Sequence, residues 1–397
     1  MTGIFGGRNG KRPGETVGNK ITILYVFAAL PVGGAEQVLV TEVEGLDKNR
    51  YRPLVTVISE KGPVGEVIEK MGIPVIPLSR MKSKQFDFGI IQELKTLMQR
   101  EKVSLVHTHL YDGGKYGRLA AWLAGVPAVV HTVHNIYVKK RRKHHWINWG
   151  LAAITDRIIA VSGAVKESLI RYDRIRPDKI QVLYNGINFS LMEAPGDREA
   201  IRSGLGLGPD DLVIGVVARL EEQKGHKILL EALSSIPSIP PNLKVLFVGN
   251  GKLRSALEAE TQRRGLSRQV VFLGTRQPVS PILRALDLFV LPSLWEGFSM
   301  AILEAMAMGL PVIATKVGGA AEVITSEQNG YLISPADPKA LAEAIQEAMR
   351  HPGRFQEMAG KGRETVRENF SKERHVLQLQ ELYQEVLEAK GVQTKGS

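Results

Sequence analysis

The stretch Leu288–Gly319, with the sequence LFVLPSLWEGFSMAILEAMAMGLPVIATKVGG, decides the fold of this chain. Its first four residues are apolar and are followed by a proline and a serine, as expected for a short buried strand. Ser299 then stands where a helix N-cap is favoured, and residues 300–308 contain no helix breaker. A second apolar run, residues 311–315, predicts another strand. Strand, helix and strand in this order predict a parallel α/β sheet.

Two carboxylates, Glu296 and Glu304, lie eight residues apart around the start of this helix. Ligands of open α/β sheets bind at the carboxyl ends of the strands, which is where this turn would lie. The neighbours of Glu304 are nearly all apolar, so its helix is predicted to be buried. Because a buried carboxylate needs a partner, Glu304 is either a structural residue bonded to backbone or an arginine, or a ligand for hydroxyl groups.

The length of 397 residues suits two domains better than one core. The chain has no cysteine, which excludes disulfides, thiolate metal sites and a cysteine nucleophile. No stretch reaches the roughly 18 consecutive apolar residues of a membrane span. Residues 1–19 lack the apolar core of a signal peptide, and we expect them to be a disordered tail. A cytoplasmic location follows from these features as an expectation.

The positive charge is concentrated in the first half of the chain. Residues 1–190 hold 28 Lys and Arg against 16 Asp and Glu, whereas residues 191–397 hold 24 against 25. A basic first half favours an anionic partner. Helix-turn-helix, RNP and zinc-finger patterns are lacking, which argues against nucleic acid.

One segment, residues 138–149 with the sequence VKKRRKHHWINW, combines basic and aromatic side chains. It predicts either a solvated loop before a helix whose tryptophans are core, or contact with an anionic membrane surface or acceptor. On the second interpretation the protein lies at the inner face of the cell membrane. The contact residues would then be Lys139, Lys140, Arg141, Arg142, Lys143 and Trp146.

Strand and helix patterns alternate along two halves of the chain. The predicted strands of the first half are 21–27, 54–59, 73–78, 103–107, 128–132, 157–161 and 179–183. Those of the second half are 212–218, 244–248, 270–273, 288–291, 311–314 and 331–333. The pattern stops between them, at the sequence NGIN of residues 185–188. We therefore predict two doubly wound domains, residues 20–190 and 191–371, and a last helix, residues 372–390, that packs back on the first domain.

Several polar residues follow predicted strands and are candidates for a site at the sheet edge. Gly33 and Gly34 precede a helix in the first domain, where a helix N-terminus favours an anion. Arg219 and Lys224 could hold a diphosphate, although Glu221 and Glu222 offer ordinary surface pairing. Gly249 and Asn250 form a further strand-exit turn, which is either usable by a base or a sugar or an ordinary turn.

Four histidines, His107, His109, His131 and His134, lie near two neighbouring strand ends and raise the question of zinc. No carboxylate or cysteine is evident as a third ligand, so we expect core histidines and no metal. His134 is the exception, since it follows a strand and would face the cleft between the domains.

Five motifs in order resemble the retaining GT-B glycosyltransferases of family 4. They are EGFSMAILE at 296–304, ARLEEQKG at 218–225, the Gly33–Gly34 loop, the NGIN linker and PVIATKVGGAAEVI at 311–324. The resemblance implies two Rossmann-like domains facing a central cleft. It also implies a retaining, metal-independent hexosyltransferase that needs no cofactor. The donor would be a UDP- or GDP-sugar, and the acceptor a glycan or lipid-linked molecule of cell-envelope polysaccharide or glycolipid synthesis. A nucleotide-sugar epimerase or phosphorolytic enzyme, and a non-catalytic subunit, remain as alternatives on the same fold.

The resemblance further implies roles for individual residues. Glu304 would bind ribose hydroxyls, Glu296 the hydroxyls of the donor sugar, and His134 would lie near the reacting carbon. The cations Arg219 and Lys224 would neutralise the leaving diphosphate, completing a catalytic set with Glu296 and His134. Backbone groups would complete the donor site, at Gly33, Gly34, Gly249, Asn250, Gly297, Phe298, Ser299 and Met300.

Overall fold

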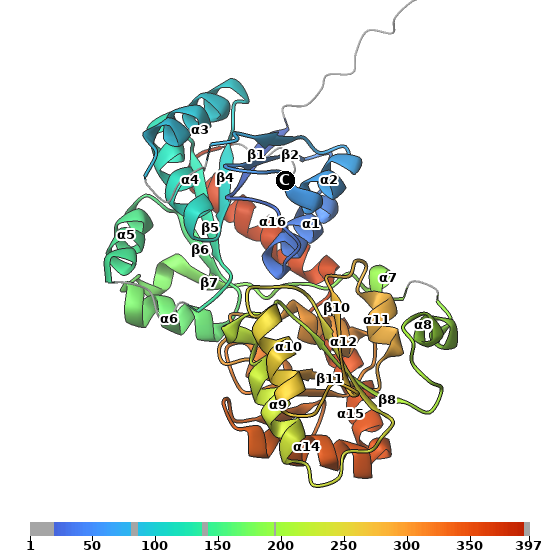
Figure 1. Cartoon of the computed structure of the whole chain (residues 1–397). Helices are drawn as coiled ribbons and strands as arrows, with labels where there is room; N and C mark the ends of the chain where they lie inside the picture. Colours follow the sequence, from blue (N-terminus) through green and yellow to red (C-terminus); the bar gives the residue numbers. More distant parts are fainter. Residues whose placement is uncertain (1–19, 81–85, 137–141, 194–195, 393–397) are drawn as a thin grey trace, which may run out of the picture.

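The computed structural model describes residues 20–80, 86–136, 142–193 and 196–392, so the tail predicted at residues 1–19 lies outside the described residues. Two parallel sheets with helices on both faces lie one above the other (Figure 1). This arrangement confirms the predicted fold class of two Rossmann-like α/β domains.

The first sheet has seven strands in the order β3-β2-β1-β4-β5-β6-β7, all paired in parallel. Its strands are β1 (Ile21–Phe27), β2 (Tyr51–Val57), β3 (Val75–Pro77), β4 (Leu105–His109), β5 (Ala128–Val133), β6 (Arg157–Ala160) and β7 (Ile180–Val182). The helices between them are α1 (Gly34–Gly45), α2 (Gly62–Lys70), α3 (Phe88–Arg100), α4 (Tyr111–Ala124), α5 (Arg142–Ala153), α6 (Gly163–Asp173) and the 3-10 helix η1 (Pro177–Lys179). Every residue of the interior strand β1 is buried, because helices cover both faces of a parallel sheet.

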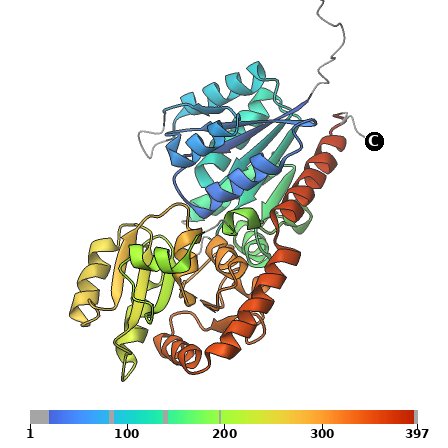
Figure 2. The same ribbon diagram turned by 90° about the vertical axis from the view of Figure 1, so that its right-hand side faces the viewer.

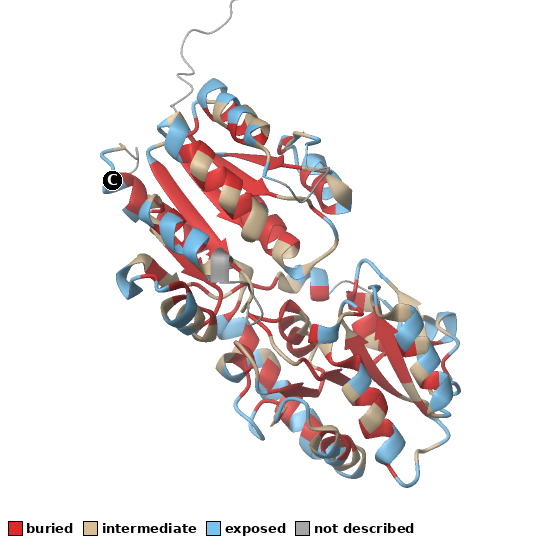
Figure 3. Cartoon of the chain, turned by 60° about the vertical axis from the view of Figure 1, so that its left-hand side comes forward, coloured by how far each residue is buried: buried red, intermediate tan, exposed pale blue. Residues whose placement is uncertain are grey.

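The second sheet has six strands in the order β10-β9-β8-β11-β12-β13. They are β8 (Leu212–Val217), β9 (Leu243–Val248), β10 (Val270–Gly274), β11 (Leu288–Leu291), β12 (Val312–Thr315) and β13 (Tyr331–Ile333). Helices α7 (Phe189–Met192) and α8 (Arg198–Gly204) precede this sheet. The remaining helices are η2 (Glu222–Lys224), α9 (His226–Ser235), α10 (Arg254–Arg263), α11 (Ser280–Ala285), α12 (Met300–Ala307), α13 (Ala320–Val323), α14 (Pro338–Arg350) and α15 (Pro352–Asn369). The opening stretch therefore forms β11, α12 and β12, and both strands lie inside the sheet, between β8 and the edge strand β13. Figure 3 shows most strand residues of both domains as buried.

The last helix, α16 (Lys372–Glu388), follows the second domain in sequence but lies along the first (Figure 2). It packs against α1. Its buried apolar residues join the core of the first sheet, where they meet residues of β1 and β2; they are Leu379, Leu382, Tyr383, Val386 and Leu387. The chain thus passes between the domains twice, once after β7 and once before α16.

Strand β4 differs from its prediction in a way that matters for the site. It runs from Leu105 to His109, two residues beyond the predicted end at His107. Both histidines of the sequence HTH therefore lie inside the strand and on one face of the sheet, with ring centroids 4.1 Å apart. The predicted strand stopped at His107 because the next two residues, Thr108 and His109, are polar and polar residues are not expected in a buried strand.

Candidate active site

The candidate site lies where the N-terminal ends of two helices, one from each domain, meet. Helix α1 begins at Gly34 after β1, and α12 begins at Met300 after β11. A Cβ atom added at Gly34 would lie 3.4 Å from Cγ of Met300, so the two helix ends are neighbours. The N-cap residues Gly33 and Ser299 make no capping hydrogen bond through a side chain. Both helix dipoles therefore point their positive ends at the space between the domains, as an anion site requires.

Glu296 and Lys224 form an ion pair at the carboxyl edge of the second sheet. Oε1 of Glu296 accepts hydrogen bonds from Nζ of Lys224 at 2.5 Å and from Oγ of Ser293 at 2.7 Å. Oε2 accepts a longer bond of 3.3 Å from Nε2 of Gln223. The side chains of Glu296 and Lys224 are only 6% and 16% exposed. The two residues predicted to bind different parts of the donor therefore hold each other in place.

Glu304 lies on α12 and is half-buried. Among the residues that the structure describes, its carboxylate has no hydrogen-bond or ion-pair partner, and burial raises the pKa of Glu304 to about 7. The structural alternative, in which backbone or an arginine satisfies this carboxylate, is thereby disfavoured. An unpaired carboxylate suits a ligand that brings hydroxyl donors.

Two loops at this edge are in close contact. One follows β8 and carries Arg219, and the other follows β9 and carries Gly249 and Asn250. A Cβ atom at Gly249, where φ is +143°, would lie 2.1 Å from the carbonyl oxygen of Ala218. The carbonyl oxygen of Asn250 accepts a 3.0 Å hydrogen bond from the N–H of Leu220. Only glycine permits this close approach. Arg219 and Asn250 are exposed at the edge that also carries Lys224.

Glu36, in the first turn of α1, is a further candidate site residue that was not predicted from the sequence. It is 6% exposed, and its carboxylate folds so closely over Gly33 that a Cβ there would lie 2.4 Å from Oε2. Burial raises the pKa of Glu36, while its own backbone N–H and Arg219 of the other domain lower it. A glutamate three positions after an N-cap is a common capping residue, and that spacing was the available signal.

His134 follows β5 and touches the loop that carries Glu296. A Cβ atom at Gly297 would lie 2.1 Å from the backbone oxygen of His134. The carbonyl oxygen of Gly297 also accepts a 2.9 Å hydrogen bond from Oγ of Ser162 in the first domain. The structure thus brings His134 beside the predicted donor loop. Phe298, next in that loop, is buried and packs its ring near Tyr184 of the first domain.

Glu322 of α13 joins the two domains directly. Its carboxylate accepts hydrogen bonds from the N–H groups of Gly163 at 2.8 Å and Ala164 at 3.1 Å, at the start of α6. Oη of Tyr184 donates a further bond of 2.9 Å to Oε2. A carboxylate of the second domain therefore caps a helix of the first, where the helix dipole favours it.

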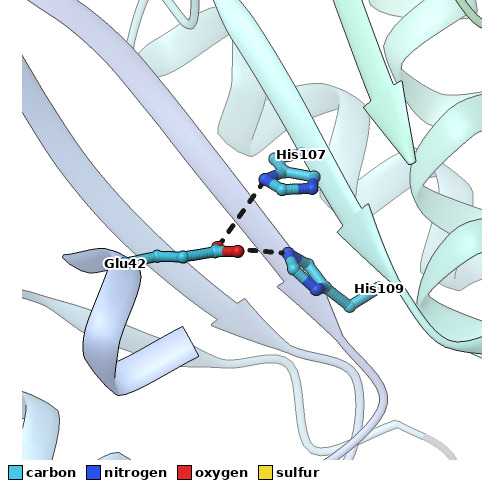
Figure 4. A group of neighbouring side chains, drawn as sticks. All are labelled: Glu42, His107 and His109. Atoms are coloured by element: carbon cyan, nitrogen blue, oxygen red, sulfur yellow. Dashed lines mark ion pairs between the residues drawn. The ribbon is translucent and has the colours of Figure 1, made fainter. Parts of the chain in front are cut away.

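The histidines of β4 are fully buried, and the structure adds Glu42 of α1 beside them (Figure 4). Oε2 of Glu42 lies 3.9 Å from Nδ1 of His107 and 3.8 Å from Nε2 of His109. The sequence did not predict that Glu42 lies near these histidines, because it belongs to a helix with no unusual pattern. His107 already uses both nitrogens, Nδ1 with Oη of Tyr383 at 2.6 Å and Nε2 with Oγ1 of Thr132 at 2.7 Å. The group therefore does not offer three free metal ligands.

The predicted membrane-contact segment is only partly described. Lys139, Lys140 and Arg141 lie outside the described residues, as do the side chains of Arg142 and Lys143. On α5, Trp146 is 60% exposed and Trp149 54%, with ring centroids 6.0 Å apart. The alternative that made both tryptophans core residues is therefore wrong.

Two family models match the chain. The model described as "Glycosyltransferase Family 4" matches residues 32–191, and the model described as "Glycosyl transferases group 1" matches residues 197–365. Together they span both domains and every candidate site residue named above.

Similar proteins agree with these matches. The UDP-Gal:alpha-D-GlcNAc-diphosphoundecaprenol alpha-1,3-galactosyltransferase of Escherichia coli is 32% identical over 339 residues, which cover 82% of this chain and 87% of that protein. The lipopolysaccharide core biosynthesis mannosyltransferase LpsB of Rhizobium meliloti is 30% identical, over 62% of this chain and 70% of its own. Among solved structures, Anabaena Alr3699/HepE in complex with UDP-glucose has a TM-score of 0.83 at 25% identity, covering 92% of this chain and all of that one.

Proposed function

The chain belongs to the group 1 glycosyltransferases of family 4, enzymes that transfer a sugar from a nucleotide-sugar, and we propose that it uses a UDP-hexose with retention of anomeric configuration and without a metal ion. The meeting of two helix N-termini with Arg219 and Lys224 carries this proposal. These groups supply the positive field that a leaving diphosphate needs. UDP is favoured because the Escherichia coli relative is named for UDP-Gal and the Anabaena structure holds UDP-glucose.

The chemistry follows from where charge develops. As the bond between the anomeric carbon and the diphosphate oxygen breaks, negative charge grows on the diphosphate and positive character on the sugar ring. We propose that the neighbouring helix ends at Gly34 and Met300 stabilise this negative charge. Lys224 turns from Glu296 toward the diphosphate. Glu296 can then accept hydrogen bonds from the hydroxyls of the sugar. Glu304 accepts the ribose hydroxyls.

Retention requires that the acceptor oxygen attack the face from which the diphosphate leaves. We propose that the leaving phosphate oxygen takes the proton of the acceptor hydroxyl, while the acceptor oxygen bonds to the anomeric carbon. The products are the glycoside and UDP. Glu296 and Glu304 lie on one loop–helix unit and bind donor hydroxyls; they do not act as an acid and nucleophile across the scissile bond.

The test is the stereochemistry of the product. The chain, treated with EDTA, is incubated with a UDP-hexose and a short-chain lipid diphosphate sugar, and the new anomeric signal is assigned by proton NMR. We expect an α-linked product from an α-linked donor, with the rate unchanged by EDTA. An inverted linkage would overturn retention, and a rate restored only by Mg²⁺ or Mn²⁺ would overturn metal independence.

The acceptor is proposed to be a sugar on a membrane-borne lipid diphosphate used for cell-envelope polysaccharide. Support comes from the basic first half of the chain, the exposed pair Trp146 and Trp149, and the acceptor named for the Escherichia coli relative. No helix within the described residues is long and apolar enough to cross a membrane. From the basic charge and the exposed tryptophan pair, we propose that the first domain rests on the inner face of the membrane.

The epimerase or phosphorolytic alternative is not favoured by the two family models or by the named relatives, which are those of glycosyltransferases. Incubating donor without acceptor separates the two, since an epimerase would convert the donor alone.

A further inference from the structure

A chain of polar contacts runs from His375 on α16 through Glu42 and His109 to His134, and the tautomer of its first member, His375, can be assigned from its hydrogen-bond partner. Nδ1 of His375, on α16, lies 2.7 Å from the backbone oxygen of Tyr184. A carbonyl oxygen can only accept a hydrogen bond, so Nδ1 of His375 must carry a proton. This assignment follows from the partner and not from an observed hydrogen position.

The contact between His375 and Glu42 determines which oxygen of Glu42 carries no proton. Nε2 of His375 lies 3.4 Å from Oε1 of Glu42. Two lone pairs facing each other in a buried site repel, so one proton lies between these atoms, either on the imidazolium or on the carboxyl group. In both cases Oε2 of Glu42 carries no proton and is an acceptor.

The contact between Glu42 and His109 determines which ring nitrogen of His109 carries the proton. Oε2 of Glu42 and Nε2 of His109 face each other at 3.8 Å, and within the described residues each is a buried atom without a hydrogen-bond partner. Because Oε2 is an acceptor, Nε2 of His109 must carry the ring proton. The separation exceeds a hydrogen bond, and a shift of about 1 Å or one bridging water closes it without changing the direction of donation.

The contact between His109 and His134 determines the tautomer of His134, beside the donor loop. Burial holds the pKa of His109 well below its usual range and lowers that of His134 to about 3, so both rings are neutral. With its proton on Nε2, His109 has a bare Nδ1, and that atom lies 2.9 Å from Nε2 of His134. His134 must therefore donate through Nε2, which leaves its Nδ1 with a lone pair.

We propose that Glu42 acts through His109 to fix His134 as the Nε2–H tautomer, so that Nδ1 of His134 accepts a hydrogen bond from a hydroxyl of the donor sugar. Nδ1 has no partner among the described residues, and the backbone of the same residue touches Gly297 in the donor loop. Glu42, His109 and His375 are positioning residues in this scheme. The role of the sugar hydroxyl rests on the proposed function; the tautomer does not.

The direct test is nitrogen NMR of the chain labelled with ¹⁵N-histidine, which distinguishes the two neutral tautomers. The signals of His134 are identified by their loss in His134→Asn. We expect the Nε2–H form in the wild type. Glu42→Gln should keep it, because the amide nitrogen can donate to His375 while its oxygen accepts from His109. Glu42→Leu removes that acceptor and should produce a mixture of both forms at His134.

A matched control lies in the same buried cluster. Thr132→Val removes a hydroxyl bonded to Nε2 of His107, the ring nitrogen that does not face Glu42, and should leave His134 unchanged. If Glu42→Leu does not fold, His109→Phe serves, because it keeps an aromatic ring but removes the acceptor of the His134 proton. An unaltered Nε2–H form in both Glu42→Leu and His109→Phe would overturn the proposal. Stoichiometric zinc in the purified chain, lost in Glu42→Leu, would also overturn it.

Kinetics connect the tautomer to the reaction. Only the Nε2–H fraction of the mixture accepts the sugar hydroxyl, so kcat/KM should fall in Glu42→Leu in proportion to that fraction, by about twofold for an equal mixture, and Glu42→Gln should restore it. The affinity for UDP, which lacks the sugar, should be the same in all three proteins. Equal weakening of UDP and UDP-sugar binding would indicate a merely structural role. If the tautomer changes as expected but no sugar is transferred, the proposed function fails while the proton assignment stands.

Discussion

Nζ of Lys224 lies 2.5 Å from Oε1 of Glu296, and these are the two side chains proposed to bind the diphosphate and the sugar of one donor molecule. The ion pair keeps both in place before the donor arrives. It must open when the donor binds, because Lys224 cannot reach a diphosphate and remain fully engaged with Glu296.

Replacing Lys224 should therefore lower both the free energy of unfolding and kcat/KM, for two independent reasons. Lys224→Ala leaves the Glu296 carboxylate buried without its counter-ion, and we expect a loss of about 2 kcal/mol in the free energy of unfolding. We also expect kcat/KM to fall by about 100-fold or more, from the lost charge stabilisation. Urea unfolding and initial rates measure the two effects. The double variant Lys224→Ala, Glu296→Gln should recover most of the stability and none of the activity; equal instability of both variants would contradict the pairing.

Donor affinity should depend on pH through Glu304. The free carboxyl has a pKa of about 7, raised by burial. Ribose hydroxyls donate to the ionised form, so donor binding favours deprotonation. KM for the UDP-sugar should rise as pH falls below 7, by up to about tenfold per pH unit, and should level off above it. Glu304→Gln should show a higher KM that does not change with pH; a pH dependence that persists in this variant would assign it to another group.

Glu304 should also lower the stability of the unliganded protein. Its folded pKa is raised above the unfolded value, so the folded state binds the proton more tightly and loses stability as pH rises from about 4.5 to about 7. Above pH 7, Glu304→Gln should be more stable than the wild type by about 2–3 kcal/mol, and at pH 4 the two should be alike. Thermal unfolding at both pH values checks this, and a difference that does not vary with pH would refute it.

Glu36 places a negative charge at the helix end where the diphosphate is proposed to bind. Glu36→Gln should tighten UDP binding by about threefold to tenfold at low salt, because one like charge is removed, with a smaller gain at high salt. Calorimetric titration measures the affinity. Glu66→Gln, an equal charge change on the exposed face of α2, serves as the control. Weaker UDP binding in Glu36→Gln would instead make Glu36 a direct ligand of the donor.

The bonds from Glu322 to Gly163 and Ala164 should favour the closed arrangement of the domains. Glu322→Gln keeps the shape but weakens two charge-assisted hydrogen bonds, so we expect a larger radius of gyration by small-angle scattering and a several-fold higher donor KM. Glu327→Gln, which loses an exposed pair with Arg354 inside the second domain, should change neither. No difference between the two variants would remove Glu322 from domain closure.

Much of the fold was predictable because strands and helices follow local patterns. The apolar runs and N-cap residues of the opening stretch predicted β11, α12 and β12 to within one or two residues. Residues of the second domain that share one sheet edge, such as Lys224 and Glu296, could be grouped because parallel strands end at the same edge.

The contributions of Glu36, Glu42 and Glu322 were not predictable in this way. Each lies in a helix of unremarkable pattern, and each acquires its role from a partner far away in sequence. Glu42 gains significance from His375, 333 residues later, and Glu322 from a helix start about 160 residues earlier. A one-dimensional pattern carries no information about such pairings. The same distance hid the relay behind His134, although its histidines were visible in the sequence.

The position of α16 also determines the order in which the chain can fold during synthesis. The first domain emerges first from the ribosome, yet its core includes Leu379, Leu382 and Tyr383, near the end of the chain. An N-terminal domain ordinarily folds before the rest is made. Here the second domain is complete while the first still exposes the apolar face of α1 that α16 covers. The core of the first domain therefore stays incomplete until α16 has been synthesised.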